Sequence, residues 1–157
     1  MNQSKKFFAN LKEIIIPTSV TKVVETQKFD EMKDLQSLCC DTKFFDFLPD
    51  PLQLTSLVIP EGVTELKTNQ FKIFDEEVLK SLSIATSVEK IEEKCFVEFN
   101  ELTYLECSNK WLKYIQKENI EYYNIPYGVE NLRLPKCDKM NKLKRLSLPL
   151  TLRDITD

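Results

Sequence analysis

The sequence predicts a repeat solenoid in which each repeat adds one strand to a parallel β-sheet, and three observations lead to this fold class. One apolar pattern recurs seven times, its central residues are 18 to 25 positions apart, and each centre lies in a short run with strand periodicity. A period of this length is typical of stacked repeats whose units cover one another's apolar faces. We therefore interpret residues 1–157 as a single domain with one long core.

Each repeat has apolar residues at the same five relative positions, so the register can be followed along the chain. The other four positions lie three residues before the centre and two, six and nine residues after it. The seven centres are Ile14, Leu38, Leu57, Leu82, Leu105, Tyr123 and Leu146. All 35 positions are apolar or aromatic in a chain that is 42% hydrophobic, so chance alignment is a poor explanation.

Short runs around the centres predict one strand per repeat. In Leu57-Val58-Ile59 the residues two apart are apolar, as in a strand with one buried face. A long return segment follows each run, so neighbouring strands must pair in parallel. Proline lacks the amide hydrogen that a sheet ladder needs, and we expect it to end the strand in four repeats. These prolines are Pro17, Pro60, Pro126 and Pro149.

Two repeats, beginning at Leu35 and Leu102, are shorter than the others. They have Cys40 and Cys107 at the second position after the centre, and bulky aromatic residues at the next two pattern positions. The longer repeats have room for one more apolar anchor in the return segment, namely Phe29, Phe71, Phe96 and Cys137. We expect all pattern positions to point inward and the variable stretches to lie on the outer face, where insertions cost least.

The pattern Leu-x-x-Leu-x-Ile-Pro-x-x-Val-x-x-Ile, with Phe four or five residues later, resembles the BspA-type leucine-rich repeat. The clearest matches are LKEIIIPTSVTKV (11–23), LTSLVIPEGVTEL (54–66) and IEYYNIPYGVENL (120–132). The resemblance runs from about Leu11 to Ile155 and implies a right-handed superhelix. Its parallel sheet of about seven strands would line the concave side, with short helical or irregular convex segments. Such repeats occur in adhesins of anaerobic bacteria and in protozoan proteins, so the family implies no single activity.

The chain departs from many leucine-rich repeats at the fifth position after the centre, where those repeats place an asparagine that caps backbone along the stack. The residues at this position are Ser19, Lys43, Gly62, Ser87, Lys110, Gly128 and Thr151. The chain therefore has no asparagine ladder, which is consistent with the BspA type.

The composition argues against an enzyme. The sequence has no histidine, which excludes His-based nucleophilic machinery and His-based metal sites. Neither Gly62 nor Gly128 belongs to a phosphate-binding loop, and adjacent Cys39-Cys40 lacks zinc or redox spacing. The acidic clusters Asp75-Glu76-Glu77 and Glu89 to Glu93 are expected to be solvated surface charge with no pocket. We predict a non-catalytic protein without cofactor or metal.

Charge and hydropathy limit which classes of partner and which cellular locations we expect for this protein. The net charge is −3 and the basic residues are dispersed, so nucleic acid is not an expected partner. No apolar run reaches the length of a membrane span, and the N-terminus lacks the apolar core of a signal peptide. We expect Cys40, Cys95, Cys107 and Cys137 to be buried thiols and Cys39 to face outward. These features predict a cytoplasmic protein, with display at the cell surface by a route without a signal peptide as the alternative.

The expected concave face holds the candidate binding residues. One outward column reads Glu13, Ser37, Ser56, Ser81, Tyr104, Tyr122 and Arg145, and the next reads Ile15, Cys39, Val58, Ser83, Glu106, Asn124 and Ser147. Tyr104 and Tyr122 should be neighbours beside Arg145, with Glu106 and Asn124 adjacent, and Tyr and Arg are enriched in binding hot spots. Ile15, Cys39 and Val58 should form an apolar strip. A cross-strand Tyr pair also stabilises a sheet without any partner.

Three functional hypotheses follow. The first is a non-catalytic module that binds an unidentified partner protein through the concave face. The second, by analogy with the resembling family, is a cell-surface adhesion protein. The third is a structural segment of a longer array or a self-associating unit, because neither end has a recognisable polar cap. Phe7-Phe8 resembles the tail of a preceding unit, and the inward residue Ile155 is almost the last residue.

Overall fold

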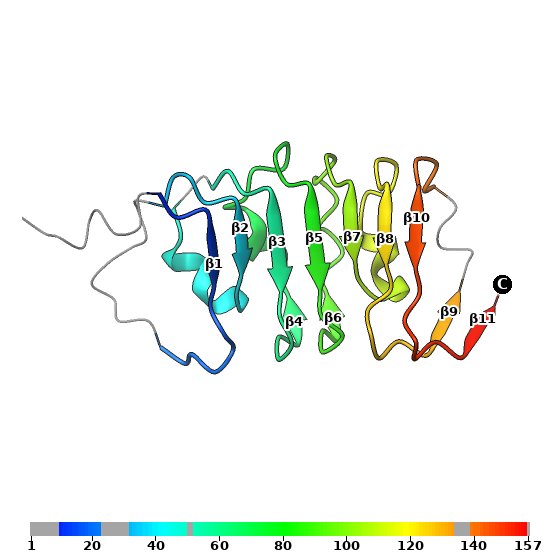
Figure 1. Ribbon diagram of the computed structural model, residues 1–157. Coiled ribbons are helices and arrows are strands. Elements are labelled where there is room, and N and C mark those ends of the chain that lie inside the picture. Colours follow the sequence, from blue (N-terminus) through cyan, green and yellow to red (C-terminus); the bar gives the residue numbers. More distant parts are fainter. Residues whose placement is uncertain (1–9, 23–31, 50–51, 134–138, 157) are drawn as a thin grey trace, which may run out of the picture.

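The computed structural model describes residues 10–22, 32–49, 52–133 and 139–156 (Figure 1). A parallel sheet of seven strands runs along the molecule, with the strands side by side in chain order. They are β1 (Glu13–Ile15), β2 (Ser37–Cys39), β3 (Ser56–Ile59), β5 (Ser81–Ile84), β7 (Tyr104–Glu106), β8 (Tyr122–Asn124) and β10 (Arg145–Ser147). Each pattern centre pairs with the next, from Ile14 with Leu38 to Tyr123 with Leu146. This register confirms the predicted solenoid and its strands.

The prolines end their strands as predicted, and a tight turn follows each of them. Pro60 comes directly after β3, and its carbonyl oxygen accepts a hydrogen bond from the amide of Val63 at 3.4 Å. The same bond closes the turns of Pro17, Pro126 and Pro149. Gly62 is the third residue of its turn and has a φ of 101°, and Gly128 has a φ of 96° in the equivalent turn. A type II turn requires such a positive φ at this position, which glycine adopts without strain.

The return segments are of two kinds, which the sequence pattern did not distinguish. The longer repeats of β3, β5, β8 and β10 contain a second short strand, and these strands form two separate parallel pairs, β4 (Glu65–Leu66) with β6 (Lys90–Ile91) and β9 (Asn131–Arg133) with β11 (Asp154–Thr156). In the two short repeats a 3₁₀ helix takes this place, η2 (Thr42–Phe47) and η4 (Asn109–Tyr114). Because η4 lies in the repeat between those of β6 and β9, it separates the two pairs. Helix η3 (Thr68–Phe71) follows β4.

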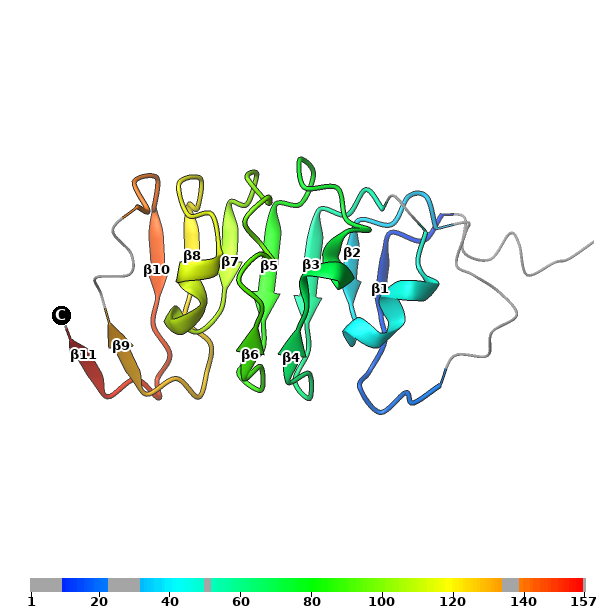
Figure 2. The same ribbon diagram turned by 180° about the vertical axis from the view of Figure 1, so that it is seen from behind.

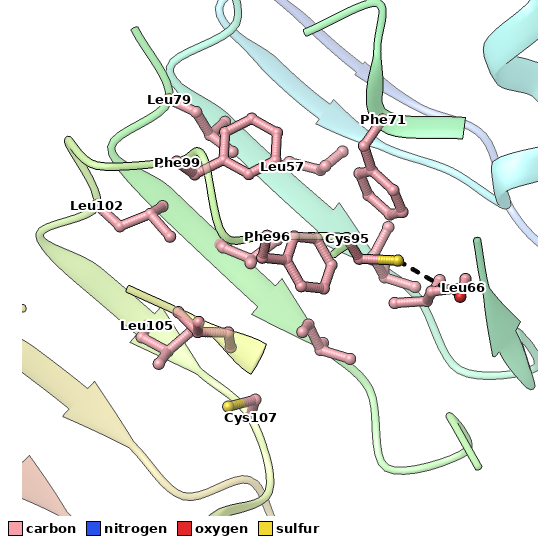
Figure 3. Packing of buried hydrophobic residues seen from close by; sticks show 14 of the residues in the cluster. Leu57, Leu66, Phe71, Leu79, Cys95, Phe96, Phe99, Leu102, Leu105 and Cys107 are labelled. Carbon is pink, nitrogen blue, oxygen red and sulfur yellow. Dashed lines mark hydrogen bonds between the residues drawn. The ribbon is translucent and has the colours of Figure 1, made fainter. Parts of the chain in front are cut away.

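The helices lie behind the seven-stranded sheet, opposite the face seen in Figure 1 (Figure 2). The core fills the space between the sheet and the return segments, and it includes the five internal pattern centres. Phe71 and Phe96, two of the predicted extra anchors, are buried, and their rings meet edge to face at 4.7 Å (Figure 3). Cys40, Cys95 and Cys107 are buried as predicted. Val23, Phe29 and Cys137 lie outside the described residues.

One expectation was wrong at both ends of the solenoid. The pattern positions of the first and last repeats are not fully buried: Ile14, Ile16 and Val20 are half-buried, and Leu146, Leu148 and Ile155 are exposed. The reason is that a repeat covers its apolar face with the next repeat along the stack. The two terminal repeats have such a neighbour on one side only among the described residues.

The adjacent thiols of Cys39 and Cys40 are expected to differ in reactivity. Burial, together with the nearby Cys39 and Asp41, raises the pKa of Cys40 to about 12. Cys39 is half-buried, and burial and the charge of Glu13 also raise its pKa. Because the thiolate is the reactive form, labelling of Cys39 in the folded protein should be slow at neutral pH and accelerate as the pH rises, while Cys40 stays unlabelled. Mass spectrometry after alkylation measures both rates.

The matched variants Cys39→Ser and Cys40→Ser provide the control. Cys39→Ser should remove the more reactive thiol of the pair, and Cys40→Ser should retain it. Equal labelling of the two cysteines in the native state would contradict the burial of Cys40.

Candidate functional site

The structure brings the five candidate residues of the second half of the sheet together on three neighbouring strands. Tyr104 of β7 pairs with Tyr122 of β8, which pairs with Arg145 of β10. In the next column Glu106 pairs with Asn124. Side chains two residues apart on a strand point to the same face, so all five project from the outward face of the sheet. We call these five residues the tyrosine patch.

Hydrogen bonds fix the centre of the tyrosine patch. The Tyr104 hydroxyl donates to Oε2 of Glu106 at 2.9 Å and accepts from Nδ2 of Asn124 at 2.7 Å. Burial and the bond to Glu106 raise the pKa of Tyr104, and these effects outweigh the opposing ones of Asn124 and Arg145. The phenol therefore keeps its proton at neutral pH, and the half-buried ring is held in one orientation.

The neighbours of Tyr104 remain accessible. Tyr122 exposes 41% of its surface, and the Arg145 side chain is also exposed. Tyrosine and arginine are enriched among the few residues that contribute most of the binding energy in protein interfaces. The tyrosine patch thus combines a rigid part, Tyr104 with Glu106 and Asn124, and an accessible part, Tyr122 with Arg145.

The predicted apolar strip lies at the other end of the same face. Ile15 pairs with Cys39, which pairs with Val58, and Ile15 exposes 66% of its surface. Strand β5 lies between the strip and the tyrosine patch, and its outward residues Ser81 and Ser83 are small. The face therefore offers two separate features, one apolar and one aromatic and charged.

A pocket on the return side corrects the expectation that the acidic clusters have no pocket near them. It has a volume of about 430 Å³ and lies between the return segments of the repeats of β3 and β5. Its lining residues are Thr68, Phe71, Lys72, Phe74, Asp75, Glu76, Lys94, Cys95, Glu98 and Phe99. Sequence reasoning missed it because Glu98 and Phe99 fall outside the repeat pattern.

The pocket has an aromatic floor and a charged rim. A hydrogen bond with Glu98 is the main reason that the pKa of Glu76 is raised, and the charges of Glu77 and Asp75 add to it. The Glu76 carboxyl group therefore keeps its proton to a higher pH than an isolated one. No three His, Cys, Asp or Glu side chains in the described part of the chain are grouped to hold a metal ion. Likewise, none of the helices in that part is long and apolar enough to cross a membrane.

The fold and its patterned face define a leucine-rich-repeat solenoid. Residues 50–136 match the BspA type leucine rich repeat region in six copies, which is more than half of the chain. The chain therefore belongs to this family. The pairing of β1, β2 and β10 in the same register extends the repeats beyond the matched residues on both sides.

No curated protein and no solved structure gives a significant match to this chain. Leucine-rich repeats suggest a protein-interaction module, and domains built from them are generally non-catalytic.

Proposed function

We propose that this chain is a non-catalytic module that binds a partner protein through the outward face of its seven-stranded sheet. The observation that carries the proposal is the tyrosine patch, in which two hydrogen bonds orient Tyr104 beside the exposed Tyr122 and Arg145. Side chains that are already ordered lose little conformational entropy on binding, and this raises the affinity that a given contact area provides.

The chemistry of the face indicates what the partner must offer. The exposed Arg145 favours a carboxylate or carbonyl acceptor, because its guanidinium donates several hydrogen bonds in a plane. Ile15 and Val58 favour an apolar segment. With neighbouring strands about 4.8 Å apart, the six steps from β1 to β10 span roughly 29 Å, so a partner that contacts both features must be extended or broad.

The competing interpretation is that the tyrosines only stabilise the sheet. Site-specific crosslinking distinguishes this interpretation from partner binding. A photoreactive phenylalanine analogue replaces Tyr122 in one variant and Tyr127 in the other. Tyr127 exposes 78% of its surface but lies after β8, near the turn of Pro126, away from the sheet face. Crosslinking of a partner from Tyr122 but not from Tyr127 is the expected result.

Affinity for the crosslinked partner then tests the energetic role of the patch. We expect Tyr104→Ala with Tyr122→Ala to weaken binding by about 30-fold, the effect of a typical hot spot, and Tyr127→Ala to change it by less than about twofold. Circular dichroism and thermal unfolding confirm that each variant folds. Unchanged affinity in a folded double variant would place the binding site elsewhere.

The cytoplasmic location remains a prediction, which labelling of intact cells with an impermeant reagent tests.

A further inference from the structure

The pocket on the return side is built by two neighbouring repeats in the middle of the array. One wall consists of η3 and the residues after it, from Thr68 to Glu76, and the other consists of residues of the next repeat, from Lys94 to Phe99. Strands β2 and β7 lie on either side of the strands of these repeats, β3 and β5. The volume of about 430 Å³ is within the range of sites for small ligands, roughly 300–1,000 Å³.

The floor of the pocket is made of three phenylalanines that belong to the core, Phe71, Phe74 and Phe99. Phe71 and Phe99 both pack against the ring of Phe96, at 4.7 and 6.1 Å between ring centroids (Figure 3). Phe74 meets the ring of Phe45 edge to face at 5.0 Å. Because these contacts hold the rings in place, the floor offers a preformed apolar surface, and aromatic rings also attract cations that lie over their faces.

Negative charge collects at the rim of the pocket. Glu76 of one wall and Glu98 of the other are exposed and are hydrogen-bonded to each other across the gap between the repeats. Every charged group that shifts the pKa of Glu76 is a carboxylate, namely that of Glu98, Glu77 or Asp75. Asp75 is already bonded to Nε2 of Gln53 at 2.7 Å. Glu76 and Glu98 are therefore the accessible acceptors, and a cation between them would relieve their mutual repulsion.

The lysines of the pocket do not supply this cation. Lys72 and Lys94 line the pocket, but both are exposed, and neither forms an ion pair with any carboxylate in the described residues. A lysine on a flexible stem can keep its ammonium group in water. The acidic side chains of the described residues are also not grouped as a metal ion requires. The combination of an apolar floor and an acidic rim therefore matches a ligand that has an apolar body and one positive charge.

We propose that this pocket binds an organic ammonium ion, with the apolar body of the ligand on the phenylalanine floor and the cationic nitrogen between the carboxylates of Glu76 and Glu98. A free amine and the lysine side chain of a peptide share this chemistry. The pocket lies among the return segments and contains no residue of the tyrosine patch, so this site is independent of the partner binding proposed above.

Three probes with the same aromatic ring test the charge preference of the pocket: benzylammonium, the neutral benzyl alcohol and the anionic benzoate. In NMR titrations of the protein, benzylammonium should bind with a dissociation constant of about 1 mM or lower and should shift the amide signals of the pocket residues. The other two probes should bind at least about tenfold more weakly, because they lack the group that the carboxylates attract. N-acetyl-lysine methylamide then distinguishes the two sources of the ligand, since equal or tighter binding indicates a peptide side chain and weaker binding indicates a free amine.

Isosteric variants locate the binding of the cation. Glu76→Gln and Glu98→Gln each remove one charge from an exposed side chain and should weaken the binding of benzylammonium by about tenfold, the effect of losing a hydrogen bond to a charged group. Glu77→Gln is the matched control, because Glu77 is also exposed but does not line the pocket, and it should change the affinity by less than about threefold. Circular dichroism confirms that each variant folds.

Four results would overturn the proposal. The first is no saturable binding of benzylammonium up to about 20 mM. The second is a preference for benzyl alcohol or benzoate, and the third is a set of shifted signals on the outward face of the sheet instead of the pocket. The fourth is wild-type affinity in both folded variants, Glu76→Gln and Glu98→Gln.

Discussion

Replacing Phe96 by alanine should lower the free energy of unfolding by about 3–5 kcal/mol, the cost of removing a buried phenylalanine from a well-packed core. Phe96 is completely buried between the repeats of β3 and β7. Its ring packs against Phe71 at 4.7 Å and Phe99 at 6.1 Å between ring centroids (Figure 3). Because the ring lies between two repeats, these repeats cannot move together far enough to fill the cavity that the truncation leaves. Urea denaturation followed by circular dichroism measures the loss.

The matched control is Phe47→Ala. Phe47 occupies a pattern position but is half-buried at the end of η2, so its truncation should cost clearly less than that of Phe96. If the two substitutions lower stability equally, the phenylalanines of the return side do not form the continuous core that the structure indicates. Truncation of an exposed side chain in a turn, as in Tyr127→Ala, should change the free energy of unfolding by no more than about 0.5 kcal/mol.

The strands of the main sheet were predictable from sequence because their signal is local. A strand with one buried face alternates with a period of two, and the central positions of the repeats show this directly. Parallel pairing in chain order then fixed the two outward columns, so the neighbours Tyr104, Tyr122 and Arg145 could be named without a structure. What could not be named was the hydrogen bonding of Tyr104, because side-chain orientation depends on packing that the pattern does not encode.

The two 3₁₀ helices were missed because the pattern positions are compatible with either conformation, yet the sequence contained a signal. In the short repeats the proline position holds Asp41 and Ser108, residues that favour helix N-termini. Asp41 indeed accepts a hydrogen bond from the amide of Lys43 at 3.1 Å. Each helix also buries two consecutive apolar residues, Phe44 with Phe45 and Trp111 with Leu112, where the strand-forming repeats have one.

The absence of an asparagine ladder was recognised from sequence, but its replacement was not. The hydroxyl of Ser87 accepts a hydrogen bond from the Gly62 amide at 2.9 Å and donates one to the Val63 carbonyl oxygen at 2.9 Å. Thr151 bridges Gly128 and Val129 in the same way, at 3.0 Å in both bonds. Serine and threonine can do this because a hydroxyl donates and accepts at once. The glycine therefore serves two purposes, since it allows the positive φ and directs its amide towards the next repeat.

We expect Ser87→Ala to lower the free energy of unfolding by about 1–2 kcal/mol, because two backbone groups lose their partner at once. The Glu61 carboxylate should not compensate, since it is already bonded to the Thr86 amide at 2.9 Å and to the Ser87 amide at 3.1 Å. Ser83→Ala, on the outward face of β5, is the matched control and should change stability by less than about 0.5 kcal/mol. Ser87→Thr should retain most of the stability, because Thr151 makes the same bridge. Equal stability of the two alanine variants would show that the repeats hold together by apolar packing alone.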